Sequence, residues 1–246
     1  MERSLYIAMS GAHQTELAMA NNTNNLANAS TTGFRADLAA FQDLPLYGPG
    51  YPSRVYAQTE QPGIDFNQGA VIATGNELDI AINGQGWIAV QARDGSEAYT
   101  RAGNFHISEL GILETASGNP VMGANGPIAI PPAEKVEIGD DGTVSVRSLG
   151  ERASTLNVVD RIKLVNPDQV NLVKREDGLL QQRDGVVAEK DPNIRVLTAV
   201  VESSNVNAVE AMVNMISLSR HFEMQIKMMK TVEETESANA QLMRLS

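Results

Sequence analysis

Apolar residues near the start of the chain recur with the spacing of a helix. Two interleaved series repeat every seven residues: Leu5, Ala12, Met19 and Leu26, and Ala8, Thr15, Asn22 and Ala29. This is the a and d pattern of a coiled-coil seam, so we predict a helix over residues 2–29. Its seam is narrow and mostly small, and an isolated helix of this kind is marginal in water. The pattern ends at Ser30–Gly33, and Gly33 can adopt the left-handed backbone conformation that often follows the end of a helix.

A longer helical pattern occupies residues 205–245. Asn207 can cap it, and Glu210 stands where its side chain can reach back to the cap. Two adjacent rows make a broad apolar face: Met215, Leu218, Phe222, Met229 and Val232, and beside them Val209, Met212, Ile216 and Ile226. The thin N-terminal helix is too narrow to cover this face, so we expect both termini to pack against other chains. The alternative is a helical hairpin that closes the core of a monomer.

The middle of the chain shows the patterns of a linker and of strands rather than that of a helix. Residues 45–63 are rich in Pro and Gly, which predicts a linker or irregular extended segment. Leu78, Ile80 and Ile82 then alternate with period two before an Asn83-Gly84 turn. Further turn signals follow at Asp94-Gly95, Asp141-Gly142, Asp177-Gly178 and Asp184-Gly185. We predict a compact β domain over roughly 76–200, with Trp87 as a core anchor.

These patterns predict an α+β fold with a discontinuous organisation. A helical coiled-coil domain is built from both termini, and a central, mainly antiparallel β domain lies between them. We expect four segments: an N-terminal helix (1–35), an extended linker (36–75), the β domain (76–200) and a C-terminal helix (201–246).

Charge and composition argue against several classes of protein and of binding site. The net charge is −11 and the pI is near 4.7, which argues against binding to nucleic acid, because that requires clustered Lys and Arg. The sequence has no Cys, so disulfides and thiolate metal sites are excluded. No apolar run approaches the roughly 20 residues that span a bilayer, and we expect no membrane insertion. The first residues do not form a secretory signal, so we expect a chain that stays in the cytoplasm or leaves it without a cleaved signal.

The residues that usually carry chemistry are not arranged for it. His13, His106 and His221 are far apart in the sequence and do not pair at metal-ligand spacing. Gly84-Gln85-Gly86 opens a strand-like run rather than a helix, so it is not a dinucleotide loop. Asp140-Asp141-Gly142 lacks the further acidic ligands of a calcium loop and is better interpreted as a tight turn. We expect no catalysis, no cofactor and no metal.

Three blocks of sequence resemble known proteins. Residues 25–35 (Asn-Leu-Ala-Asn-Ala-Ser-Thr-Thr-Gly-Phe-Arg) resemble the N-terminal signature of the flagellar basal-body rod and hook family. Residues 78–87 and 99–105 resemble the start of that family's β domain, and residues 202–216 resemble its C-terminal helix. Within the family, residues 220–225, the short stretch 45–75 and Trp87 are most similar to the proximal rod branch.

The resemblance implies a non-enzymatic subunit of the proximal rod that helps transmit torque for motility. Partners would be other copies of the chain, other rod proteins and, in transit, the flagellar type III export apparatus. It also implies export without a cleaved signal and a place in the basal-body rod within the periplasm. The terminal helices would fold on assembly and form the inner tube around the channel, and a head-to-tail contact of this kind produces a helical filament.

The resemblance gives two interpretations of five asparagines near the end of the N-terminal helix. Their amides either fix the register of a packed seam, or the helix end is frayed and solvated. They are Asn21, Asn22, Asn24, Asn25 and Asn28.

We expect the assembly interface to use the two helical seams and the segments beside them. The expected residues are Leu5, Met9, Ala12, Met19, Asn25, Leu26, Asn28, Gly33, Phe34, Asn205, Val209, Met212, Met215, Ile216, Phe222, Ile226, Met229 and Val232.

Three other functions stay open from the sequence. The chain could be a distal rod or hook subunit, which differs in copy number per basal body. Its β domain could bind or cleave peptidoglycan, although no carboxylate pair supports cleavage. It could also be a monomeric secreted binding module, which requires ordered termini in the free chain.

Overall fold

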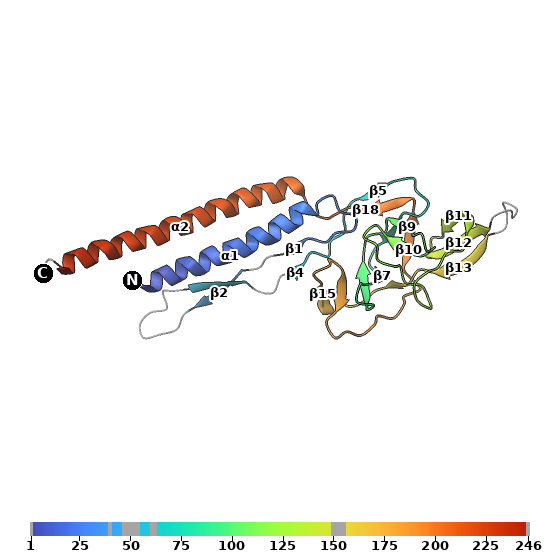
Figure 1. Ribbon diagram of the computed structural model, residues 1–246, viewed down its shortest axis with the longest axis horizontal. Coiled ribbons are helices and arrows are strands. Elements are labelled where there is room, and N and C mark those ends of the chain that lie inside the picture. The colour runs from blue at the N-terminus through green and yellow to red at the C-terminus, as the bar shows by residue number, and fades with distance from the viewer. Residues whose placement is uncertain (1, 39–40, 46–54, 60–62, 149–155, 245–246) are drawn as a thin grey trace. The chain divides into compact units, whose positions relative to one another are not determined.

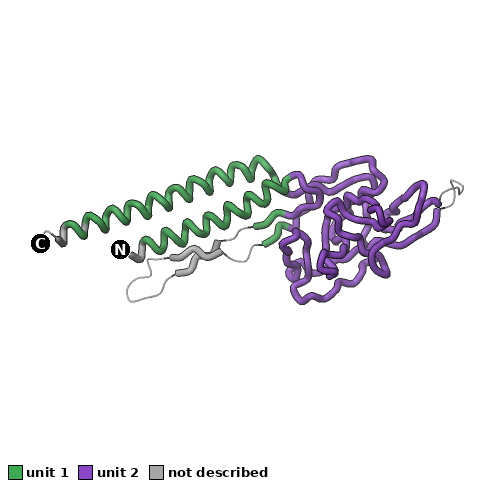
Figure 2. Tube along the Cα trace, viewed as in Figure 1, with its two compact units in different colours: residues 1–29, 36–65, 206–246 green, residues 30–35, 66–205 purple. Residues whose placement is uncertain are grey.

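The computed structural model describes residues 2–38, 41–45, 55–59, 63–148 and 156–244. The chain forms two compact units, coloured separately in Figure 2. Unit 1 comprises residues 1–29, 36–65 and 206–246, and unit 2 comprises residues 30–35 and 66–205. Helices from both termini and a mainly antiparallel β region confirm the predicted α+β fold. The four segment boundaries expected from the sequence stay predictions.

Two long helices dominate unit 1. Helix α1 spans Glu2–Ala27 and helix α2 spans Ala208–Arg244, and they lie side by side (Figure 1). The Asn207 Oδ1 accepts hydrogen bonds from the backbone N–H groups of Val209 and Glu210, as expected for an N-cap. Helix α1 ends well before Gly33. The left-handed backbone of Gly33 (φ 68°) therefore serves a later turn and does not cap the helix.

The rest of unit 1 consists of two short strand pairs. Strand β1 (Asp37–Leu38) pairs with β4 (Gly63–Ile64), and β2 (Phe41–Pro45) pairs with β3 (Val55–Thr59), both antiparallel. The sequence predicted a linker or irregular segment over 45–63. Part of that stretch, 55–59, is a strand, while 46–54 and 60–62 lie outside the described residues. Pro45 stands at the end of its strand, where the missing N–H is tolerated.

Unit 2 is built from antiparallel strands. Its largest sheet has the order β14 (Leu164–Val165), β7 (Trp87–Gln91), β8 (Glu97–Thr100), β16 (Leu180–Gln182) and β15 (Leu172–Lys174). A three-stranded sheet contains β11 (Ala133–Ile138), β12 (Thr143–Ser148) and β13 (Asn157–Arg161). Three further pairs are β5 (Val71–Ala73) with β18 (Val200–Glu202), β6 (Ile80–Asn83) with β17 (Arg195–Thr198), and β9 (Phe105–Ile107) with β10 (Leu113–Thr115). A short 3₁₀ helix spans Gln169–Asn171.

The predicted turns and core of unit 2 are largely present. Gly95 connects β7 to β8 and Gly142 connects β11 to β12, and both have the positive φ expected of a tight Asp-Gly turn. One continuous cluster of aliphatic side chains, including Ile80, Ile88 and Val144, forms the core. In β6 the intervening Ala81 is as buried as Ile80, because both faces of this strand are covered.

Candidate assembly surfaces and a buried charged cluster

A heptad pattern of burial marks the contact between α1 and α2. Apart from Ser219, the buried and half-buried residues of α2 from Ala211 onward are spaced alternately by four and three: Ala211, Met215, Leu218, Phe222, Gln225, Met229, Val232 and Glu236. This is the spacing of a coiled-coil seam. Contacts pair Asn22 with Ala211 and Gly11 with Gln225, so the two helices run antiparallel.

The α1 side of the seam is made of small residues. Ala8, Ala12 and Ala18 are buried, and a Cβ added at Gly11 would meet the Gln225 Nε2 at 3.1 Å. Small side chains allow the two helix backbones to approach closely. The Asn22 amide donates to the Ala211 carbonyl oxygen at 2.7 Å and ties the helices together near the start of α2.

The expected assembly residues fall into three groups. Ala12, Met19, Leu26, Met215, Phe222, Met229 and Val232 are buried or half-buried. Leu5, Met9, Val209, Met212, Ile216 and Ile226 are exposed. Asn25, Asn28, Gly33, Phe34 and Asn205 lie in or near the segments that connect the helices to unit 2. Their role in assembly stays a prediction.

Helix α2 carries a second apolar stripe that α1 does not cover. Val209, Met212, Val213 and Ile216 are 71%, 52%, 60% and 55% exposed, and they follow the i, i+3, i+4, i+7 spacing of one helix face. With 3.6 residues per turn, this face points away from the seam. Helix α1 likewise exposes large apolar side chains at Tyr6, Met9 and Leu17. Exposed apolar patches of this kind are typical of interaction surfaces.

Three of the five asparagines near the end of α1 have defined side-chain partners. The Asn25 amide donates to the Asp37 carbonyl oxygen at 2.8 Å, and its Oδ1 accepts the Asp37 N–H at 2.8 Å. Asn28 donates to the Asn24 carbonyl oxygen. Together with the bond from Asn22 to Ala211, these contacts agree with ordered amides that fix neighbouring segments rather than with a frayed helix end.

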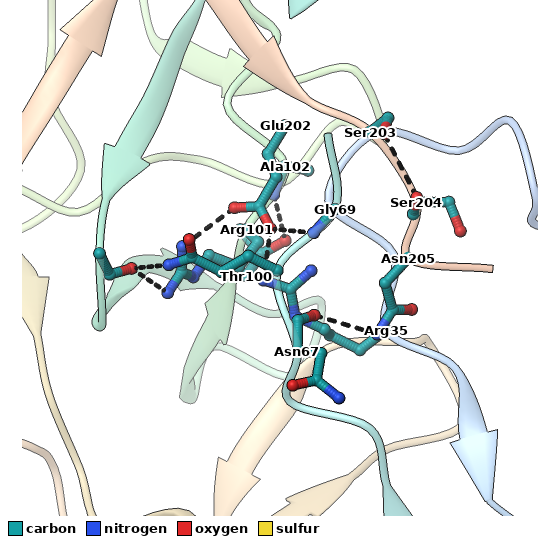
Figure 3. A network of polar contacts seen from close by, with 12 residues as sticks. Arg35, Asn67, Gly69, Thr100, Arg101, Ala102, Glu202, Ser203, Ser204 and Asn205 are labelled. Carbon is teal, nitrogen blue, oxygen red and sulfur yellow. Dashed lines mark hydrogen bonds and ion pairs between the residues drawn. The ribbon is translucent and has the colours of Figure 1, made fainter. Parts of the chain in front are cut away.

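A buried cluster of three charged residues lies in unit 2 (Figure 3). The Glu202 carboxylate forms ion pairs with Arg35 through Oε1 and with Arg101 through Oε2, the second at 2.9 Å. The three side chains are only 3%, 4% and 2% exposed for Arg35, Arg101 and Glu202. The Gly69 N–H donates to Glu202 Oε1 at 3.0 Å, and Arg101 donates to the Gly84 carbonyl oxygen at 2.8 Å.

Trp87 completes this cluster. The Cζ atoms of Arg101 and Arg35 lie 5.2 and 5.8 Å from the centroid of its ring, within the range of a cation–π interaction. Burial lowers the pKa of Arg101, while the Glu202 carboxylate opposes that shift. Trp87 is buried, as the sequence predicted. It lies beside the guanidinium groups and the Phe66 ring.

Arg35, Arg101 and Glu202 were not among the residues expected from the sequence. All three occur in the blocks that carry the family resemblance, which is the signal that could have drawn attention to them. Their contact could not be predicted, because Glu202 is 167 residues from Arg35 and 101 residues from Arg101.

The described residues contain no cluster of metal ligands. Among them, no three His, Asp or Glu side chains come together as metal ligands, and His13, His106 and His221 are all exposed. A cavity of about 710 Å³ in unit 2 is bordered by Glu97 and Lys163, which are bonded to each other at 2.8 and 2.9 Å. No helix in the described part of the chain has the length and apolar character needed to cross a membrane.

Comparison with known proteins gives three family matches. Residues 5–35 match "Flagella basal body rod protein", residues 81–146 match "Flagellar hook protein FlgE/F/G D1 domain", and residues 198–242 match "Flagellar basal body rod FlgEFG protein C-terminal". The flagellar basal-body rod protein FlgF of Escherichia coli is 40% identical over 252 residues, covering all of both chains. FlgF of Caulobacter vibrioides is 32% identical over the full length of both chains. FlgG of Agrobacterium fabrum is 33% identical, covering 96% of this chain and 97% of its own.

Proposed function

This chain belongs to the flagellar basal-body rod protein family, and on that premise we propose that it is a structural subunit of the proximal rod. The observation that carries the proposal is the 40% identity to a flagellar basal-body rod protein, with all of both chains aligned. In this role the subunit polymerises through its terminal helices into a hollow shaft that transmits torque for motility. Its work is mechanical, and no catalytic step is part of it.

The proposed partners are other copies of this chain and other rod proteins. Support comes from the apolar side chains that the α1–α2 seam leaves exposed, above all Val209, Met212, Val213 and Ile216. When one surface binds a different surface on the next subunit, the contact is head-to-tail. Such a contact builds a helical assembly wherever the rotation between subunits does not close into a ring. The seam and the stripe lie on different faces of α2, so one helix can serve both contacts.

The proposed location is the basal-body rod within the periplasm. We propose that the chain reaches it through the flagellar type III export apparatus without cleavage of a signal. Both statements follow from family membership and not from any contact in the structure.

The distal rod is the second candidate position. It stays a candidate because rod proteins named FlgG, and not FlgF alone, align over nearly the whole chain, at 31–33% identity. Labelling the chain in isolated basal bodies and locating the label by electron microscopy separates the two positions. Label confined to the membrane-proximal part of the rod supports our proposal, and label along the distal part supports the alternative.

The experiment that tests the structural role replaces the native chain in cells with a variant of the exposed stripe. Ile216→Asp places a charge in the stripe, and Asn214→Asp places the same charge on an exposed position of another face of α2. We expect basal bodies with complete rods for Asn214→Asp and few or none for Ile216→Asp, with equal amounts of both chains in the cell. Complete rods and normal swimming with Ile216→Asp would contradict assembly through this face.

A further inference from the structure

The chain makes a short detour through unit 2 between α1 and β1. Residues 1–29 and 36–65 belong to unit 1, whereas residues 30–35 belong to unit 2. The chain therefore passes between the units four times, after residues 29, 35, 65 and 205. A single connection to each helix would need only two passages, so the detour calls for a physical explanation.

The detour is held against the segment that leads to α2. The Gly33 N–H donates to the Glu202 carbonyl oxygen at 2.8 Å, and the Asn205 N–H donates to the Phe34 carbonyl oxygen at 3.3 Å. The Arg35 guanidinium pairs with the carboxylate of Glu202. Glu202 thus binds the detour with both its main chain and its side chain, six residues before α2 begins.

A second group of contacts fixes the detour from the side of the large sheet. Lys174, on strand β15, donates to the Arg35 carbonyl oxygen at 3.0 Å, and its Nζ lies 4.0 Å from the centroid of the Phe34 ring. A Cβ on Gly33 would come within 2.2 Å of the Arg101 carbonyl carbon, so the detour also lies directly on the backbone after β8.

The buried cluster contains two positive charges and one negative charge, so its three members are not equivalent. Arg101 and Glu202 alone would form a balanced pair within residues 66–205. Arg35 adds a second buried cation, and the ring of Trp87 offers its face to both guanidinium groups. Removing Arg35 therefore leaves a paired carboxylate, whereas removing Glu202 leaves two buried cations without a counter-charge.

We propose that Arg35 and Glu202 form a latch that fixes the segment after α1 and the segment before α2 to one point of unit 2. Tension on either helix is then transmitted to unit 2 at the carboxylate of Glu202. Arg35 and Glu202 act as positioning residues, because they hold the two segments and contact no ligand. The mechanical purpose of the latch rests on the proposed rod function, while the latch itself is a property of the free chain.

Amide hydrogen exchange on the purified full-length chain tests the latch directly. Arg35→Met removes the charge and keeps the apolar stem, and it should speed exchange of the Gly33 and Asn205 amides by about a hundredfold. The amides of β7 and β8 should keep their protection, and Arg35→Lys should restore part of the loss at Gly33. Unchanged protection at Gly33 and Asn205, or equal loosening of β7 and β8, would overturn the proposal.

Lys163→Met is the matched control. Lys163 forms a largely buried ion pair with Glu97 inside unit 2, with side chains 17% and 9% exposed. None of its hydrogen bonds or ion pairs among the described residues involves residues 30–35. This variant should leave the Gly33 and Asn205 amides as protected as in the native chain. Faster exchange at these amides in Lys163→Met would show that any loss of a buried pair opens the detour, which would also overturn the latch.

Swimming in media of rising viscosity tests the mechanical purpose. Cells carrying Arg35→Met should form filaments in normal number and swim normally in dilute medium, then lose speed more steeply than Lys163→Met cells as viscosity rises. Equal viscosity dependence in the two strains would overturn the mechanical part. If cells without this chain build complete rods, the proposed function fails while the exchange result still decides the latch.

Discussion

Gly11 of α1 lies directly against the side chain of Gln225 of α2, with 3.1 Å between the position of an added Cβ and the Gln225 Nε2. The contact sits in the middle of the heptad seam, where α1 offers mostly small side chains. Close approach at this point explains how a helix with so few large apolar residues can pair with α2. Large apolar side chains on the other faces of the two helices, such as Met9 and Met212, are then left for other contacts.

Size at position 11 should decide whether the helices stay paired. Gly11→Ala needs only a small shift of a flexible Gln side chain and gains up to about 1 kcal/mol of helix propensity, so we expect equal or slightly higher stability. Gly11→Leu should destabilise the helix pair by about 1–3 kcal/mol, because the extra atoms occupy the space that the Gln225 side chain fills in the seam. Urea unfolding followed by far-ultraviolet circular dichroism measures both.

Ala20→Leu is the control for this pair of variants. Ala20 is exposed on the same helix, so the larger side chain should change the unfolding midpoint little. A Gly11→Leu chain as stable as Ala20→Leu would contradict the close approach at Gly11.

Gly33 should tolerate no side chain. It combines a positive φ of 68° with only 2.2 Å between an added Cβ and the Arg101 carbonyl carbon. Gly33→Ala should therefore cost more than about 2 kcal/mol of unfolding free energy, measured by urea unfolding with the fluorescence of Trp87. Gly75 has a similar φ of 76° with no atom within 4 Å of the added Cβ, and Gly75→Ala should cost only about 1 kcal/mol. Equal losses would show that backbone strain alone matters at Gly33.

The turn between β7 and β8 should contribute a pH-dependent term to stability. Hydrogen bonds from Ser96 and from Arg175 lower the pKa of Asp94 from 3.8 to about 2. A carboxyl group with a lowered pKa in the folded state stabilises it above the unfolded pKa, and the contribution is lost as pH falls through the folded pKa. The native chain should therefore have a higher urea midpoint than Asp94→Asn at neutral pH, and the difference should shrink between pH 3.8 and about 2. A difference that is constant down to pH 2 would contradict the assignment.

Periodicity predicted the helices well because each is a long amphipathic segment with one repeating face. Of the two heptad series predicted for the N-terminal helix, only Leu5 is exposed. On α2, Met215, Phe222 and Met229 are half-buried as a seam requires. The neighbouring row of Val209, Met212, Ile216 and Ile226 is exposed. The reason is that a pattern of apolar residues shows that a face is buried in some contact, but does not say which contact buries it.

In the β region, too, local features could be predicted from the sequence, whereas long-range strand pairings could not. Asp-Gly turns such as Asp94-Gly95 and Asp141-Gly142 are local signals and could be placed from the sequence. The pairing of β5 with β18 joins segments that lie near the two ends of unit 2 in the sequence, and no local signal encodes this pairing. The cluster of Arg35, Arg101 and Glu202 depends on that long-range closure, so it became visible only in the structure.

Neighbouring subunits should cover the exposed stripe of α2 in the assembled rod. Hydroxyl-radical footprinting of Met212 tests it most directly, because this side chain is 52% exposed in the chain described here and reacts readily when solvent reaches it. We expect strong labelling of Met212 in the purified chain and little labelling in isolated basal bodies. Equal labelling in both would show that the stripe stays open to solvent in the rod, and the proposed contact would be wrong.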